Sequence, residues 1–151
     1  MFQSFNLFPQ YTALQNVMLA GQLLAKERPD YKQNRRQILA DIETQAKALL
    51  AQMGLSDREN HYPHQLSGGQ QQRVAIGRAL ITRPALILAD EPTGNLDTRN
   101  TSEVIALLKE TSRKYEQTIL MITHNRSIAQ TADRVLQVSD GCLTDFGRCR
   151  E

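Results

Sequence analysis

The most telling absence in this 151-residue chain is a phosphate-binding loop. Such loops require the pattern G-x-x-x-x-G-K-[ST], and none of the eight glycines is followed by lysine. The chain also has no tryptophan and only two cysteines, Cys142 and Cys149, with no third cysteine or histidine at metal-ligand spacing beside them. These absences exclude a zinc site at the cysteines and a complete phosphate-binding loop within these residues.

Long apolar runs and a strong net charge are missing as well. No apolar stretch approaches the roughly 20 residues that a membrane-spanning helix needs, and residues 1–5 lack the basic and then apolar pattern of a signal peptide. The formal net charge is only +2, and a basic cluster, Lys32 with Arg35 and Arg36, is flanked by acidic residues. We therefore expect a soluble, cytoplasmic protein that binds no nucleic acid, and we interpret the cluster as a solvated helix face.

The remaining composition, 40% apolar and 23% charged, is that of a globular domain with a sizeable core. Residues 12–65 have a helical character. A capping box at Thr12 predicts the start of one helix, apolar spacing predicts a second over residues 34–53, and Gly54 is placed to end it. Residues 56–65 are predicted to form a loop.

The pattern changes after Leu66, where apolar runs begin to alternate with helical periodicity. Helices are predicted over residues 67–81, 98–115 and 127–132, and strands over residues 85–89, 118–123 and 135–139, with a turn at Asp140-Gly141 leading into a last strand. Strands that alternate with helices predict an α/β fold with a mainly parallel sheet and crossover helices. The apolar strand 85–89 is expected to be buried on both faces of that sheet.

The segment Ser67-Gly68-Gly69-Gln70 permits two interpretations. Serine followed three residues later by glutamine is a capping box, which any helix can use. Two adjacent glycines directly after the cap, however, remove side chains where the first backbone N–H groups of the helix are unpaired, and a bare helix N-terminus is a preformed anion site.

Residues 66–70 resemble the signature motif of ATP-binding cassette (ABC) proteins, and the match continues to Leu80. The resemblance implies that four residues bind nucleotide in trans, at the γ-phosphate held by the other subunit of a dimer: Ser67, Gly68, Gly69 and Gln70.

Two carboxylates, Asp90 and Glu91, follow the strand predicted over residues 85–89. The carboxyl ends of parallel strands are where such sheets bind ligands, and a carboxylate pair beside phosphates suits one acid for Mg²⁺ and one for the attacking water. The run resembles the Walker B strand of ABC proteins, which implies that Asp90 binds Mg²⁺ and Glu91 is the general base.

Three further residues match ABC motifs. Residues 92–97 resemble the D-loop, which crosses the dimer interface and links the two nucleotide sites, so Asp97 is expected to be a nucleotide-binding residue there. Asp97 also suits a helix N-cap, and both roles are compatible. His124, after Thr123, resembles the switch histidine that contacts the γ-phosphate, and Asn125 stands where many relatives carry aspartate. Gln3 resembles the glutamine of the Q-loop, which reaches Mg²⁺ and water.

The resemblance implies a partial P-loop NTPase fold in three parts: a Q-loop region (1–11), an α-helical subdomain (12–65) and a core with the other motifs (66–151). It implies an ATP-hydrolysing subunit of an ABC transporter that uses ATP and Mg²⁺. Its expected partners are a second ABC ATPase subunit, identical or not, and a transmembrane permease bound through the helical subdomain at the cytoplasmic face of the membrane. The motifs look most like the lipoprotein-releasing and macrolide-export branch.

The family pattern places a phosphate-loop strand between the strand ending at Thr123 and the strand at residues 135–138, and we expect its absence to leave the isolated chain inactive. Two other functions stay open. One is a non-catalytic module that pairs with an intact cassette, which the retained Glu91 disfavours. The other is an ABC ATPase of DNA repair or translation; the repair type would carry a long coiled coil in place of residues 12–65.

Overall fold

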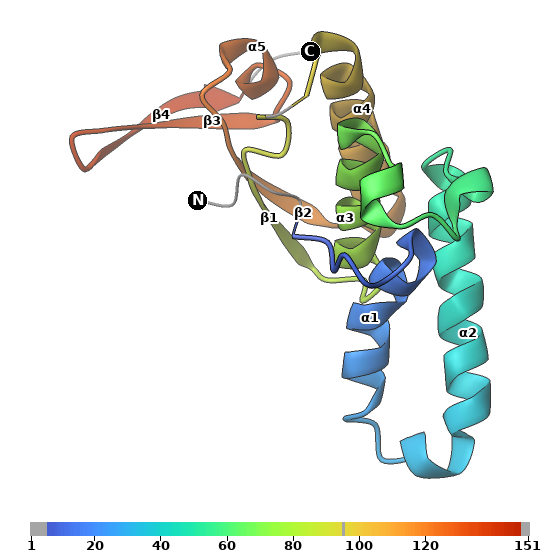
Figure 1. The fold of residues 1–151 in the computed structure, drawn as a ribbon. Coiled ribbons are helices and arrows are strands. Elements are labelled where there is room, and N and C mark those ends of the chain that lie inside the picture. The colour runs from blue at the N-terminus through green and yellow to red at the C-terminus, as the bar shows by residue number, and fades with distance from the viewer. Residues whose placement is uncertain (1–5, 95, 149–151) are drawn as a thin grey trace.

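The computed structural model describes residues 6–94 and 96–148, which form a long helical hairpin beside a body of helices and strands (Figure 1). No helix in the described part of the chain combines the length and the apolar character needed to cross a membrane. The elements are α1 (Ala13–Ala25), α2 (Tyr31–Gln52), the 3-10 turns η1 (Ser56–Arg58) and η2 (Pro63–Gln65), α3 (Gly68–Leu80), β1 (Leu86–Asp90), α4 (Thr98–Tyr115), β2 (Thr118–Ile122), α5 (Arg126–Ala129), β3 (Arg134–Ser139) and β4 (Cys142–Arg148).

The helix starts are confirmed at their caps. Thr12 and Ser67 each form a reciprocal capping box at the start of α1 and α3, and the Asp97 side chain accepts a hydrogen bond from the third residue of α4. Several boundaries differ from prediction. Helix α2 begins at Tyr31 and carries a non-helical residue, Asn34, where we predicted its start. The predicted loop over residues 56–65 holds both 3-10 turns, and α5 ends three residues early, at Ala129.

Two strand pairs make up the sheets, and the predicted α/β class is confirmed. Strands β1 and β2 pair in parallel, with α4 as the crossover between them, and Leu88 lies opposite Leu120. Strands β3 and β4 form a separate antiparallel hairpin. The hairpin turns at Asp140 (φ 49°) and Gly141 (φ 76°), as the Asp-Gly pair predicts, because both positions need a left-handed backbone.

The expectation that the first strand is buried on both faces is wrong. Ile87 is 8% exposed and packs into the core, but Leu88 is 71% exposed. Alternate strand residues face opposite sides of a sheet, so the β1–β2 pair has one covered and one bare face. The bare face carries four exposed apolar side chains: Leu86, Leu88, Leu120 and Ile122.

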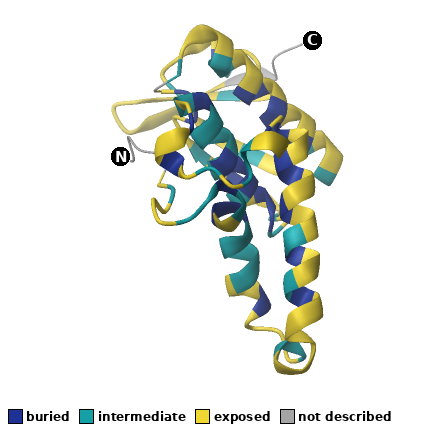
Figure 2. Cartoon of the chain, turned by 45° about the vertical axis from the view of Figure 1, so that its right-hand side comes forward, coloured by how far each residue is buried: buried dark blue, intermediate teal, exposed yellow. Residues whose placement is uncertain are grey.

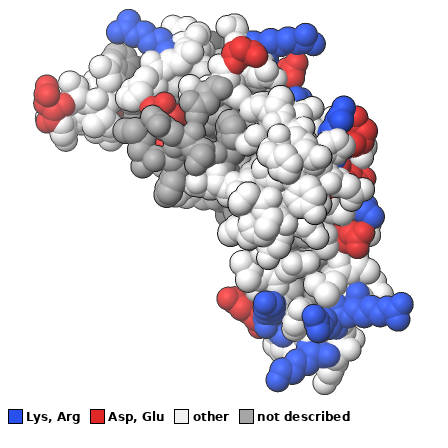
Figure 3. Space-filling view, in the orientation of Figure 1, with Lys and Arg blue, Asp and Glu red and all other residues white. Residues whose placement is uncertain are grey.

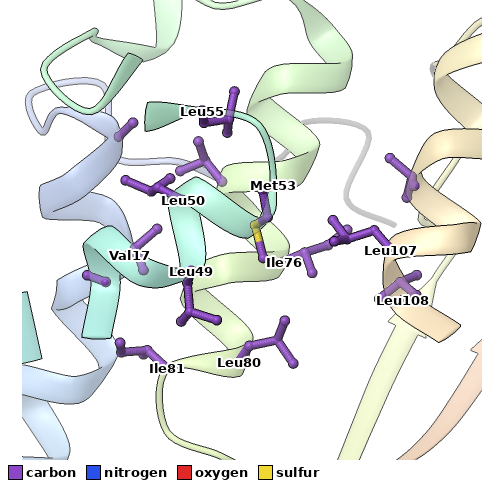
Figure 4. Close-up of a cluster of buried hydrophobic side chains, with 14 of the residues drawn as sticks. Val17, Leu49, Leu50, Met53, Leu55, Ile76, Leu80, Ile81, Leu107 and Leu108 are labelled. Atoms are coloured by element: carbon purple, nitrogen blue, oxygen red, sulfur yellow. The ribbon is translucent and has the colours of Figure 1, made fainter. Parts of the chain in front are cut away.

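One hydrophobic core joins the helical hairpin to the rest of the chain. Figure 4 shows Val17, Leu49 and Leu50 close to Ile76 and Leu80, with side chains from α4 on the other side of α3. Buried positions gather where α1 to α4 meet (Figure 2). The β3–β4 hairpin and the far end of the α1–α2 hairpin are largely exposed. The core therefore crosses the boundary predicted between residues 65 and 66, and the division into parts stays a prediction.

Asn16 holds the segment that leads into α1. Its side chain is fully buried, and it accepts a hydrogen bond from Phe8 N (2.9 Å) while its Nδ2 donates to the carbonyl oxygens of Phe8, Tyr11 and Thr12. From α3, Arg78 donates to Asn6 O at 2.7 Å. A buried side-chain amide whose donors and acceptor are all hydrogen-bonded fixes a loop more firmly than exposed contacts do. Through Asn16 and Arg78, the segment before α1 is therefore bonded to both α1 and α3.

The first turns of α3 and α4 lie in close contact. A Cβ added at Gly69 would come within 2.5 Å of Asn100 Oδ1, a distance that forces a shift. One turn further along both helices, Arg73 pairs with Glu103 at 3.3 Å. The two helix starts are therefore packed at Gly69 and joined by an ion pair.

This contact predicts that Gly69→Ala destabilises the chain even though alanine is the better helix former by about 1 kcal/mol. Overpacking against Asn100 should lower the free energy of unfolding by roughly 1–3 kcal/mol in urea titrations followed by circular dichroism. The double variant Gly69→Ala/Asn100→Ala should recover most of that loss. Strictly additive effects of the two substitutions would contradict the contact.

Candidate functional site

Glu91 and His124 meet just beyond the carboxyl ends of β1 and β2. His124 Nε2 lies 3.0 Å from Glu91 Oε1, within reach of a hydrogen bond or ion pair. Backbone pairing aligns them, because Glu91 N donates to Ile122 O at 2.9 Å and so extends the ladder past the end of β1. The sequence placed these two residues after separate strands, and the parallel register brings them together.

The backbone at Glu91 is strained. Its φ is 45°, a left-handed conformation that costs a non-glycine residue roughly 1–3 kcal/mol and that persists where surrounding structure enforces it. Gly94 supports the arrangement, since its N–H donates to Glu91 O at 3.1 Å. A Cβ at position 94 would lie only 3.1 Å from Glu91 Oε2. The turn after β1 therefore aims the Glu91 carboxylate at His124.

Asp90 is the exposed last residue of β1 and lies opposite Ile122. By strand alternation it shares the bare face of the sheet with Leu86 and Leu88. The described residues contain no group of three side chains able to hold a metal ion. Mg²⁺, however, is usually bound by one or two carboxylates together with substrate phosphates and water. Asp90 alone therefore fits a magnesium–nucleotide complex and does not fit an all-protein metal site.

The signature segment forms the start of α3. Ser67 Oγ accepts from Gln70 N at 3.3 Å, and Gln70 Oε1 accepts in return from Ser67 N at 2.9 Å. Ser67 is exposed and Gly68 half-buried, so the start of the helix is accessible. Gly69 is buried against Asn100, so packing on α4 explains why that position holds a glycine.

Two residues that sequence reasoning missed hold this segment. Gln71 Nε2 donates to Pro63 O (3.0 Å) and Leu66 O (3.1 Å), which ties the turn before the signature to α3. Asn100 contacts Gly69 and also donates through Nδ2 to Asp97 Oδ2 at 2.8 Å. No local pattern indicates these roles, because Gln71 binds the turn before α3 and Asn100 contacts Gly69 on a different helix.

Asp97 caps α4. Asn100 N donates to Asp97 Oδ1 at 2.8 Å, and this bond together with that from the Asn100 side chain holds the pKa of Asp97 below its ordinary value. The capping role is therefore present, and the interface role stays a prediction. Asn100 thus connects Asp97, the cap of α4, with Gly69 at the start of α3.

Gln3, the remaining sequence-predicted site residue, lies outside the described residues. In the part of the chain that the structure describes, no hydrogen bond or ion pair joins the signature residues (67–70) to Asp90, Glu91 or His124. Among the described residues, the predicted site residues therefore fall into two groups that no printed bond connects: Asp90, Glu91 and His124 at the strand ends, and residues 67–70 at the start of α3.

Comparison with known proteins agrees with these motifs. A sequence model of the ABC transporter family matches residues 1–94. The lipoprotein-releasing system ATP-binding protein LolD 2 of Rhodopirellula baltica is 44% identical over 144 residues, which are 95% of this chain and 54% of that protein. The macrolide export ATP-binding/permease protein MacB of the same organism is 44% identical over 149 residues, which are 99% of this chain and 20% of that protein.

The fold leads to the same family. The dimeric ATP-binding cassette MJ0796, solved in a post-hydrolysis state with ADP and Pi, superposes with a TM-score of 0.76 at 34% identity, over 99% of this chain and 62% of that one. The chain spans about half the length of the LolD relative. LolD and MacB proteins are among its relatives, and the chain belongs to the ABC transporter family.

Proposed function

We propose that this chain supplies the hydrolytic and signature parts of an ATP-binding subunit that couples ATP hydrolysis to transport by a membrane partner. The contact between Glu91 and His124 carries the proposal, because it places a carboxylate and an imidazole together at the ligand-binding edge of a parallel sheet. The strained backbone at Glu91 disfavours a module that only pairs with other cassettes, since such a module gains nothing from that strain.

In the proposed reaction Glu91 accepts a proton from the water that attacks the γ-phosphate of ATP, the bond to the β–γ bridging oxygen breaks, and ADP leaves with phosphate as the second product. His124 orients the Glu91 carboxylate and contacts the γ-phosphate. Asp90 would hold Mg²⁺, which neutralises charge on the phosphates, with Gln3 as a further ligand. A positioned general base contributes typically about 10²- to 10⁴-fold to the rate.

We propose that the signature residues serve a second cassette. The separation of Ser67–Gln70 from Glu91 within this chain supports action in trans, and the solved relative MJ0796 is described as a dimer. The exposed Ser67 and the first N–H groups of α3 then face the γ-phosphate of the partner's nucleotide.

We further propose that the helical part, residues 12–65, docks on a permease at the cytoplasmic face of a membrane. The MacB relative, whose name joins ATP-binding and permease functions, supports a permease partner. The core shared by α1, α2 and α3 would transmit movement of the docked hairpin to the signature helix. The transported substrate is decided in the permease.

A phosphate loop must come from residues other than these 151. The division into β1–β2 and β3–β4 supports a missing strand between β2 and β3, and the bare face with Leu88 and Ile122 supports a missing covering layer. We propose that a phosphate-loop segment, with its strand and helix, fills both places.

The isolated chain is expected to bind Mg-ATP weakly or not at all and not to hydrolyse it, because nothing in it cradles the β- and γ-phosphates. Calorimetric titration and phosphate release would measure both properties. The Glu91→Gln variant and the surface control Glu110→Gln should, like the wild-type chain, release no phosphate from ATP. ATP hydrolysis by the wild-type chain that Glu91→Gln abolishes and Glu110→Gln preserves would contradict the proposal.

The signature should act without the phosphate loop. An intact LolD-type relative whose own signature serine is replaced by arginine should regain phosphate release when mixed with this chain, through one composite site of two. Ser67→Arg in this chain should abolish the rescue, whereas Glu91→Gln should preserve it, because Glu91 serves the other site.

Light scattering should detect the mixed complex in the same samples. Two results together would count against action in trans: phosphate release by the mixture no faster than that of the mutant relative alone, and no complex in light scattering. Equal loss of rescue in Ser67→Arg and Glu91→Gln would show that the two clusters serve one site.

A further inference from the structure

The turn that joins α1 to α2 gathers five basic side chains within a short stretch. We call residues 23–36 the hairpin tip. It carries two acidic side chains, Glu27 and Asp30, and five exposed basic ones: Lys26, Arg28, Lys32, Arg35 and Arg36. The tip thus has a formal charge of +3 while the whole chain has +2, so the other residues together are slightly acidic. Figure 3 shows these cations gathered at the lower end of the molecule.

Two of the tip's charges neutralise each other. Arg28 and Asp30 form a two-point ion pair, with Nη2 at 2.9 Å from Oδ2 and Nε at 3.0 Å from Oδ1. The other four cations are exposed: Lys26 directly follows α1, and Lys32, Arg35 and Arg36 lie in the first turns of α2. Their charge is available to a surface outside this chain.

Exposed leucines stand beside these cations. Leu23 is 54% exposed and Leu24 52% exposed, in the last turn of α1. They lie outside the small core that holds the tip in place, which Ala25, Ile38 and Ile42 form. Apolar side chains next to lysine and arginine are typical of elements that rest in the headgroup region of a bilayer.

We propose that the hairpin tip binds an anionic lipid membrane surface directly. The cations would lie over the lipid phosphates, and Leu23 and Leu24 would enter the boundary with the acyl chains. The leucines favour a membrane over a nucleic acid, whose phosphate backbone offers no apolar surface. The tip also projects away from the carboxyl ends of β1 and β2 (Figure 1), so contact with lipid leaves the edge with Glu91 and His124 accessible.

The inference goes beyond docking on a permease, because it assigns lipid contact to the cassette itself. Each basic side chain near an anionic surface strengthens binding by roughly fivefold, an effect that salt screens. Four unpaired cations and two leucines therefore suffice for weak, salt-sensitive association.

Flotation of the purified 151-residue chain with vesicles tests the proposal, since bound protein rises and aggregated protein does not. Vesicles of equal parts phosphatidylglycerol and phosphatidylcholine should carry the chain upward at low salt and release it as salt rises. Lys32→Gln/Arg35→Gln/Arg36→Gln should weaken binding by roughly 100-fold. Leu23→Ser/Leu24→Ser should weaken it at unchanged charge.

A matched control removes the same charge elsewhere: Lys109→Gln/Arg113→Gln/Lys114→Gln, on the exposed side of α4, should bind like wild type. Circular dichroism confirms that each variant is folded. Three results would overturn the proposal: equal loss in both triple variants, equal binding to pure phosphatidylcholine through the bare sheet face, or tighter tip-dependent binding to duplex DNA. None of these measurements involves ATP, so the outcome is independent of the proposed hydrolysis.

Discussion

The parallel pairing of β1 with β2 is the constraint on which the site depends. It sets Leu88 opposite Leu120 and continues one residue further, through the bond from Glu91 N to Ile122 O. This register decides that Glu91 and His124, 33 positions apart in the printed sequence, lie 3.0 Å apart. A slip of one residue would turn the inward side chains of a strand outward. The core against α3 and α4 therefore holds the position of Glu91 and His124 as well as the fold.

A second contact links the parts that act on different nucleotides in the proposed dimer. Asn100 lies against Gly69 at the start of the signature helix and also bonds to Asp97 in the D-loop. Arg73 and Glu103 reinforce the same junction one turn later. Because packed interiors transmit small shifts, movement of the signature helix would reach the D-loop through this junction. The tie between Arg78 and Asn6 gives the segment before α1 a similar link to α3.

Local features were predictable from the sequence and tertiary ones were not. The caps at Thr12, Ser67 and Asp97 followed from side chains that bond their own next turn. Glu91 and His124 were identified one at a time from resemblance, but their contact required the strand register. The bare face of β1 escaped prediction because an apolar pattern shows which residues favour burial and does not show which element covers them. Asn100 escaped because its neighbours come from two different helices.

In the proposed function, Glu91 and His124 form a hydrolytic half-site that needs only a phosphate loop. The most direct test joins this chain to the phosphate-loop segment of the solved relative MJ0796 and measures ATP binding and phosphate release. We predict that hydrolysis appears and falls by about 100-fold or more in Glu91→Gln, with ATP binding retained. A joined protein that binds ATP and hydrolyses it equally fast with glutamine at position 91 would contradict the account.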